Sequence, residues 1–311
     1  MLSRTASCLY WLGRYVERAD FTARLVEATV RLDALSARPA GEAAWQSALI
    51  VTGADEAFAA TGETLTAHSV ARFLTLSDTH PGSIVSCLSM ARNNARAVRT
   101  ALTREAWTAI NRAWLIFSNR SSPGGTQATL NLAEQTKAET RGFEGAMHRM
   151  MRDQASWFVQ LGSAIERADN TARLLDVKYH LLLPAGETVG GTVDRDQWTT
   201  ILQTVSAVTA YRWLYREGLR PADVVELLVV RRELPRSLAA ACEEVVNLLN
   251  ALAKRMGLQG QADRMARARL SHFARLTVEQ IFAQGFHEYL GAFIDENAEL
   301  DGAIARQFRF F

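Results

Sequence analysis

The chain has 311 residues, 48% of them hydrophobic, which is enough apolar material for a sizeable core and excludes an intrinsically disordered protein. Its 35 Lys and Arg residues nearly balance 33 Asp and Glu residues, so net charge gives no general attraction to nucleic acid or to an anionic membrane. Three cysteines fit neither a disulfide framework nor a zinc site, and no apolar run reaches the roughly 18 residues of a transmembrane helix. These features favour a cytoplasmic protein that binds neither nucleic acid nor a membrane.

Helices are predicted along almost the whole chain, because only 6 residues are proline and Ala, Leu, Arg and Glu recur throughout. Clusters of Gly and Pro between the apolar periodic segments predict turns, including a long Gly-rich turn over 184–191. The predicted helices cover 2–35, 43–60, 66–76, 83–101, 103–118, 127–183, 195–217, 221–231, 235–256 and 262–297. The segment 127–183 is expected to break near Gly142 or Asp153. The predicted fold class is therefore all-α.

An internal repeat is the sharpest signal in the sequence. Residues 12–25 and 161–174 are identical at 10 of 14 positions, and both copies contain Glu-Arg-Ala-Asp and Thr-Ala-Arg. Weaker matches follow in the same order at shifts of 153 and 154, among them Trp45 with Trp198, Leu49 with Leu202, Pro81 with Pro235 and Ser83 with Ser237. We interpret the chain as a tandem duplication of a unit of roughly 150 residues, with 1–150 and 151–311 forming one compact, pseudo-twofold helical bundle.

Each copy of the repeat carries an apolar stripe and a charged stripe when it is placed on a helix at about 100° per residue. The charged stripe contains Glu17, Asp20 and Arg24 in the first copy and Glu166, Asp169 and Arg173 in the second. In both copies an Asp precedes an Arg by four residues, the spacing of an intrahelical ion pair. Gly13 and Gly162 fall in line with these stripes, which suggests close approach of another backbone or of a ligand.

Two interpretations of the charged stripes remain open. In the first, each stripe is a solvated face whose ion pairs are worth a few tenths of a kcal/mol. In the second, the two halves pair about a pseudo-twofold axis and bring the stripes together, either as a buried network or as a groove for a zwitterionic ligand or a charged partner segment. The facing residues would then be Glu17, Arg18, Asp20 and Arg24 on one side and Glu166, Arg167, Asp169 and Arg173 on the other.

Taken together, these motifs resemble the alpha-E family of all-helical bacterial proteins, which is named for a recurring Glu-Arg motif. The resemblance covers nearly the full length. It rests on Leu9-Tyr10-Trp11-Leu12-Gly13-Arg14-Tyr15, both Glu-Arg-Ala-Asp copies, Ala91-Arg92-Asn93-Asn94-Ala95-Arg96, Trp107 with Asn111, Pro235-Arg236-Ser237 and Gly285-Phe286-His287-Glu288-Tyr289. The chain departs from the family pattern at Thr79-His80-Pro81, where Asn-Pro is expected in many relatives, and at Phe21, where Asn is common.

The resemblance implies an association with circularly permuted ATP-grasp proteins, often beside transglutaminase-like proteins, in systems that make or modify peptides. Our first hypothesis is a helical subunit that acts with an ATP-grasp ligase, with ATP and Mg bound by that partner and no cofactor in this chain. In an enzymatic version, Glu17 and Glu166 would be the acid–base groups. The substrate or partner would be bound by Arg18, Asp20, Arg24, Arg167, Asp169 and Arg173. The alternative is a non-catalytic scaffold in which the same stripes are structural ion-pair networks.

Metal chemistry finds little support in the sequence. A di-iron helical bundle needs Glu-x-x-His on two helices, and no Glu-x-x-His occurs. The six histidines are scattered without an i,i+4 pair that would suit zinc. We therefore expect no metal site, and we expect Cys8, Cys87 and Cys242 to be structural thiols.

Overall fold

The computed structural model describes residues 1–310 except 36–39, 121, 123 and 181–190. Over these residues it contains fifteen α-helices and no strand, which confirms the all-α class. Up to the middle of the chain they are α1 (Ser3–Leu35), α2 (Ala40–Thr52), α3 (Asp55–Ala59), α4 (Ala67–Leu76), α5 (Ile84–Ala97), the 3₁₀ turn η1 (Arg99–Ala101), α6 (Arg104–Phe117) and α7 (Thr126–Met147). The remainder are α8 (Gln154–His180), α9 (Thr192–Thr204), α10 (Val208–Leu214), α11 (Pro221–Val225), the π segment η2 (Glu226–Val230), α12 (Leu238–Met256), α13 (Gln261–Phe273), α14 (Val278–Gln284) and α15 (Phe286–Phe308).

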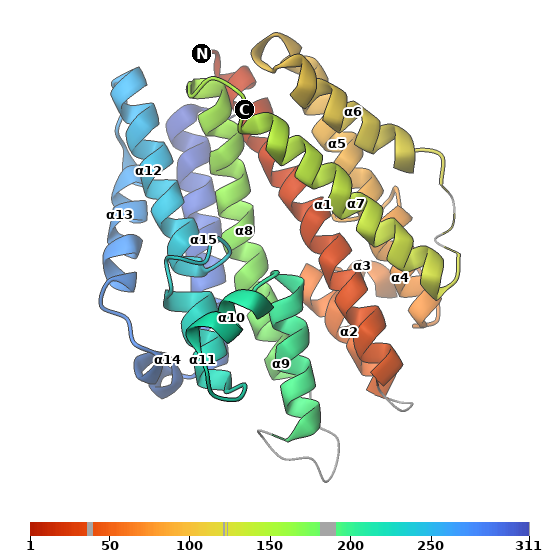
Figure 1. Cartoon of the computed structure of the whole chain (residues 1–311). Helices are drawn as coiled ribbons and strands as arrows, with labels where there is room; N and C mark the ends of the chain where they lie inside the picture. Colours follow the sequence, from red (N-terminus) through yellow and green to blue (C-terminus); the bar gives the residue numbers. More distant parts are fainter. Residues whose placement is uncertain (36–39, 121, 123, 181–190, 311) are drawn as a thin grey trace.

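The two longest helices, α1 and α8, run through the middle of the molecule and form its most extensive helix–helix contact (Figure 1). They carry the two copies of the Glu-Arg-Ala-Asp repeat. Helices α5 and α7 pack on α1, and helices α12 and α15 pack on α8. The repeated segments therefore lie at the centre of the fold, where other helices surround them.

Two apolar cores lie along this central pair. One surrounds Leu12 and Val16 of α1 together with Leu161 and Ile165 of α8. The other surrounds the following turns of both helices, and each core contains residues from both 1–150 and 151–311. The charged side chains of the repeat lie where one core gives way to the next, so their pairing affects how the two halves pack.

Three predicted helices each divide into separate α-helices, which their sequence pattern did not indicate. The segment 43–60 divides at Gly53, and the segment 195–217 divides at Ser206, because both residues adopt the left-handed conformation, with φ of 62° and 58°. The segment 262–297 is wrong as a single helix: it ends at Phe273, resumes as α14, and is interrupted again at Gly285, where φ is 97°. Helix α15 then continues to Phe308.

The predicted break in 127–183 falls at Asp153, whereas Gly142 lies inside α7. The Asp153 carboxylate accepts a hydrogen bond from the Ala155 backbone N–H at 2.9 Å and so caps the start of α8. The long turn predicted over 184–191 lies almost entirely outside the described residues. Within the described part of the chain, no helix has both the length and the apolar character needed to cross a membrane.

Candidate functional site: the paired Glu-Arg motifs

Helices α1 and α8 cross at two glycines with almost no space between the backbones. A β-carbon added to Gly13 would lie 2.0 Å from the Val159 carbonyl oxygen, and one added to Gly162 would lie 2.0 Å from the Tyr10 carbonyl oxygen. Any larger residue at either position would push the helices apart. The expectation that these glycines mark the close approach of another backbone is confirmed.

One turn further along, the two Glu-Arg motifs bind each other reciprocally. The Arg18 Nε donates to Glu166 Oε1 at 2.6 Å, and the Arg167 Nη2 donates to Glu17 Oε2 at 3.1 Å. The arginine of each motif therefore neutralises the glutamate of the other. This reciprocity fits the pseudo-twofold interpretation at the crossing, while the duplication of the whole 150-residue unit remains a prediction.

A second arginine completes the surroundings of each glutamate. Arg14 donates to Glu166 at 2.8 Å, and Arg236 donates to Glu17 at 2.8 Å. The Glu17 and Glu166 side chains are only 1% and 2% exposed. Burial opposes ionisation of Glu17, but the charges of Arg167 and Arg236 outweigh it and lower its pKa to about 2. Arg18 and Arg14 outweigh burial in the same way at Glu166 and lower its pKa.

The aspartates of the repeat form the predicted ion pairs along their own helices. Arg24 donates to Asp20 at 2.6 Å, and Arg173 donates to Asp169 at 2.7 Å. Beyond this pair, the two aspartates differ. Asp20 also accepts hydrogen bonds from Arg236 and from the Thr140 hydroxyl, both at 2.9 Å, and is 3% exposed. Asp169 is 19% exposed, and its pKa is raised because burial outweighs the attraction of Arg173.

One pair of corresponding residues accounts for part of the difference between the aspartates. At the shift of 154 that aligns Pro81 with Pro235, Gly82 corresponds to Arg236. In the second half the Arg236 side chain fills the space beside Glu17 and Asp20. In the first half Gly82 supplies no side chain, and a cavity of about 460 Å³ remains beside Asp169. We call this cavity the Gly82 pocket; its charged and polar lining includes Arg18, His80, Glu166, Asp169, Asn170 and Arg173.

His80 lines the Gly82 pocket and has a buried ring nitrogen without a hydrogen-bond partner among the described residues. Its ring stacks on Phe73 with centroids 4.7 Å apart, and the residue is only 7% exposed. Among the described residues, none forms a hydrogen bond with its buried Nε2. Burial, followed by the charge of Arg18, lowers the pKa of His80, so the ring is neutral at pH 7. A buried polar atom without a partner costs about 1–3 kcal/mol. The Nε2 lies against Gly82, 2.8 Å from where a β-carbon would stand.

The structure thus distributes the predicted site residues over three environments. Arg18, Asp169 and Arg173 line the Gly82 pocket, with Glu166 also contributing to its wall. Arg24 lines a separate cavity. Glu17, Asp20 and Arg167 belong to the network between the two cores.

Sequence reasoning missed Arg14, Arg236 and His80 as members of this site. A signal for Arg236 does exist, because this residue lies between Pro235 and Ser237, which match Pro81 and Ser83. The contrast between Arg236 and Gly82 is therefore visible in the amino-acid sequence itself. The role of His80 is not, because its burial depends on the fold.

Other chemistries find no cluster to support them. Among the described residues, no three His, Cys, Asp or Glu side chains gather closely enough to hold a metal ion. Cys87 and Cys242 are buried as predicted, and burial raises the pKa of each thiol to about 12. Cys8 is half-buried.

The fold and the crossing define a class of all-helical protein in which two central helices pair through Glu-Arg motifs. The chain belongs to the Alpha-E family, described as "a predicted alpha-helical domain with a conserved ER motif", and the match covers residues 1–309. The expected resemblance is confirmed. Neither a curated protein nor a solved structure matches the chain.

Proposed function

We propose that this protein is a binding subunit that acts with a circularly permuted ATP-grasp ligase in peptide-bond formation or peptide modification. In this proposal the Gly82 pocket holds a zwitterionic group, such as a free amino acid or a peptide end. The observation that carries the proposal is the cavity left beside Asp169, where Gly82 stands in place of an arginine. The ATP-grasp partner follows from the family resemblance.

The charges around the Gly82 pocket suit a ligand that carries both signs. Among the described residues, Arg173 is the one ion-pair partner of Asp169. Asp169 is therefore the natural acceptor for an ammonium or guanidinium group, placed as the Arg236 guanidinium is placed beside Asp20. Arg18 and Arg173 line the same pocket and can donate to a carboxylate. The neutral His80 ring contributes an uncharged part of the wall.

We assign Glu17 and Glu166 a structural role within this proposal. A general base must reach the proton that it removes, and it works best when its pKa lies near the operating pH. Glu17 is buried, ionised and held by Arg167 and Arg236, with a pKa of about 2. Glu166 is held in the same manner by Arg14 and Arg18. The enzymatic version regains support if Glu17→Gln or Glu166→Gln abolishes activity while the variant stays folded.

The test fills the Gly82 pocket with an arginine, as Arg236 fills the corresponding space beside Asp20. The double variant His80→Leu/Gly82→Arg copies the Leu234-Pro235-Arg236 sequence, and it places a guanidinium beside Asp169. His80→Leu is needed because a β-carbon at Gly82 would lie 2.8 Å from the His80 Nε2. The single His80→Leu variant is the matched control, because it leaves the pocket open.

Binding of free amino acids and dipeptides is measured by calorimetry, and ADP release is measured with an ATP-grasp protein from the same genome. We expect the wild type and His80→Leu to bind, and the double variant to lose both binding and stimulation of ADP release. Unchanged ligand binding by the folded double variant would refute the role of the Gly82 pocket. Binding that persists without any effect on ADP release would refute the partnership alone.

A further inference from the structure

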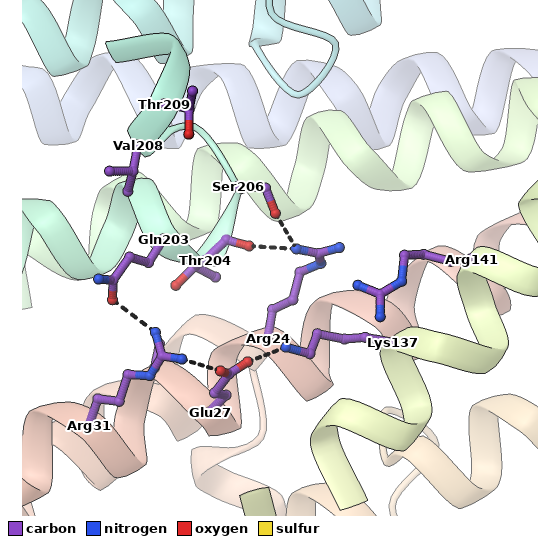
Figure 2. A pocket seen from close by; sticks show the side chains of 11 residues that line it. Arg24, Glu27, Arg31, Lys137, Arg141, Gln203, Thr204, Ser206, Val208 and Thr209 are labelled. Carbon is purple, nitrogen blue, oxygen red and sulfur yellow. Dashed lines mark hydrogen bonds and ion pairs between the residues drawn. The ribbon is translucent and has the colours of Figure 1, made fainter. Parts of the chain in front are cut away.

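A second cavity lies on another side of α1, between α7 and the turn that joins α9 to α10 (Figure 2). Its volume is about 360 Å³. We call it the Arg24 pocket; its charged and hydroxyl-bearing lining consists of Arg24, Glu27, Arg31, Lys137, Arg141, Thr204, Ser206 and Thr209. Four of these residues are cations and one is an anion, so the pocket differs in character from the charge-balanced Gly82 pocket.

The cations converge from two helices. Figure 2 shows Arg24 from α1 and Arg141 from α7 directed toward each other, and Lys137 of α7 beside them with its ammonium group at Glu27. Each carboxylate in reach is shared by at least two cations. Glu27 binds both Arg31 and Lys137, Glu134 binds both Lys137 and Arg141, and Asp20 binds both Arg24 and Arg236. The four cations of the pocket therefore share three carboxylates, which leaves an excess of positive charge at the cavity.

Arg24 is held in place before any ligand arrives. Its Nε donates to Asp20 at 2.6 Å, and its Nη1 donates to the Ser206 hydroxyl at 2.8 Å and to the Thr204 carbonyl at 3.3 Å. Its side chain is 11% exposed. Among the described residues, none accepts a hydrogen bond from the Arg24 Nη2, which Figure 2 shows directed toward Arg141. A fixed guanidinium with an available N–H group is suited to an oxyanion.

Ser206 carries a side chain where the backbone favours glycine. Its φ is 58°, in the left-handed region, and its N–H donates to the Gln203 carbonyl. Gly53, the corresponding residue at a shift of 153, has φ of 62° and makes the same kind of bond to Ile50. Glycine adopts this conformation without steric cost, whereas serine does not. The turn alone therefore does not explain the serine, but its hydroxyl on the pocket wall does.

We propose that the Arg24 pocket binds a phosphate group carried by a small molecule. A phosphate presents oxygens in several directions, so it can accept from Arg24, Lys137, Arg141 and the Ser206 hydroxyl together. A carboxylate offers only two oxygens and one charge, and Glu27 already supplies such a group at the pocket. This site is separate from the Gly82 pocket and does not depend on the function proposed for it.

The first test uses inorganic phosphate, with acetate and chloride at matched ionic strength, in calorimetric titrations of the full chain. The key variant is Arg141→Gln, and its matched control is Arg112→Gln. Both arginines are exposed, at 52% and 59%, and each pairs with a glutamate of α7, but only Arg141 lines the pocket. We expect phosphate to bind the wild type and Arg112→Gln equally, and Arg141→Gln at least about ten-fold more weakly. Equal weakening in both variants, or heat no larger for phosphate than for acetate, would overturn the proposal.

The second test uses Ser206→Gly, which separates binding from folding. We expect this variant to have a higher Tm than the wild type, because the left-handed strain is relieved, and yet to bind phosphate several-fold more weakly. Unchanged phosphate binding would remove Ser206 from the site, and equal losses of Tm and of binding would make its role merely structural. The double variant His80→Leu/Gly82→Arg should bind phosphate as the wild type does, so failure of one pocket is distinguishable from failure of the other.

Discussion

The surroundings of Glu17 and of Glu166 begin from the same motif and end differently. Around Glu17, Arg236 crosses from the second half and binds both Glu17 and Asp20, so the polar layer is filled. Around Glu166, the second arginine is Arg14 of α1, and Asp169 is left beside a cavity where Gly82 has no side chain. The comparison teaches that one motif can hold two helices together and, where an arginine is replaced by glycine, also form the wall of a cavity.

The ion pairs around Glu17 should contribute more to the stability of the fold than those beside Asp169. Replacing both members of a buried ion pair by apolar groups often leaves stability unchanged. Removing one member is destabilising, because it leaves an uncompensated buried charge. Glu17 and Asp20 both depend on Arg236, whereas Asp169 depends on Arg173 and remains partly exposed. The same class of substitution should therefore have different effects on the two sides.

The largest expected effect is that of Arg236→Met, which removes a partner from two buried carboxylates. We expect the free energy of unfolding to fall by about 3–5 kcal/mol in urea titrations, because Glu17 and Asp20 are left undercompensated. The control is Arg232→Met, whose 3.4 Å pair with Glu243 lies at the surface and should be worth less than about 1 kcal/mol. If both variants lose the same stability, the filled network is not what fastens the halves.

Acid should weaken the Glu17 network next. The pKa of Glu17 is about 2 in the folded protein and 4.5 ordinarily, so the unfolded chain binds a proton first as pH falls. The stabilisation is fully present above pH 4.5 and is lost as pH falls toward 2. It amounts to about 3–4 kcal/mol at about 1.4 kcal/mol per pKa unit. Urea unfolding at pH 6 and pH 3 should show a larger loss for the wild type than for Glu17→Gln. Parallel losses in the two proteins would place the acid sensitivity elsewhere.

Substitutions of Gly13 and of Gly162, where α1 and α8 cross, should be equally destabilising. Gly13→Ala and Gly162→Ala each place a β-carbon 2.0 Å from a carbonyl oxygen, and we expect each to cost about 1–3 kcal/mol or more. Gly145→Ala in α7 is the control, because a β-carbon there meets nothing within 4 Å and alanine is the better helix former by up to about 1 kcal/mol. Unequal effects at Gly13 and Gly162 would show that the crossing is less symmetric than its contacts indicate.

Much of this arrangement was predictable from the sequence, because it depends on local periodicity and on a repeat. The all-α class follows from the composition and periodicity of the whole chain. The spacing within 12–25 and 161–174 predicted the charged stripes and the close approach at Gly13 and Gly162, with pairing of the stripes as one of two interpretations. The interruption at Ser206 was not predictable, because nothing in the local pattern marks a serine for a left-handed conformation. The burial of Glu17, Glu166 and His80 could not be predicted either, since helical phase fixes directions but not what covers each face.

The smallest expected effect on stability, Asp169→Asn, is the sharpest test of the difference between the halves. Burial raises the pKa of Asp169, so the ionised carboxylate is less stable in the folded protein than in the unfolded chain at neutral pH. Its removal relieves that cost but loses a partly exposed pair with Arg173, worth about 0–1 kcal/mol, so the net change should be under about 1 kcal/mol.

The matched variant Asp20→Asn removes the negative charge that Arg24 and Arg236 share in a buried setting, so it should cost about 3 kcal/mol by breaking paired charges. Urea unfolding of the two variants, together with calorimetric amino-acid binding, completes the comparison. We expect Asp169→Asn to keep its stability and lose ligand binding, and Asp20→Asn to lose stability. If Asp169→Asn lowers the free energy of unfolding as much as Asp20→Asn does, the Asp169 carboxylate is as structural as that of Asp20. It would then not be available to bind a ligand in the Gly82 pocket.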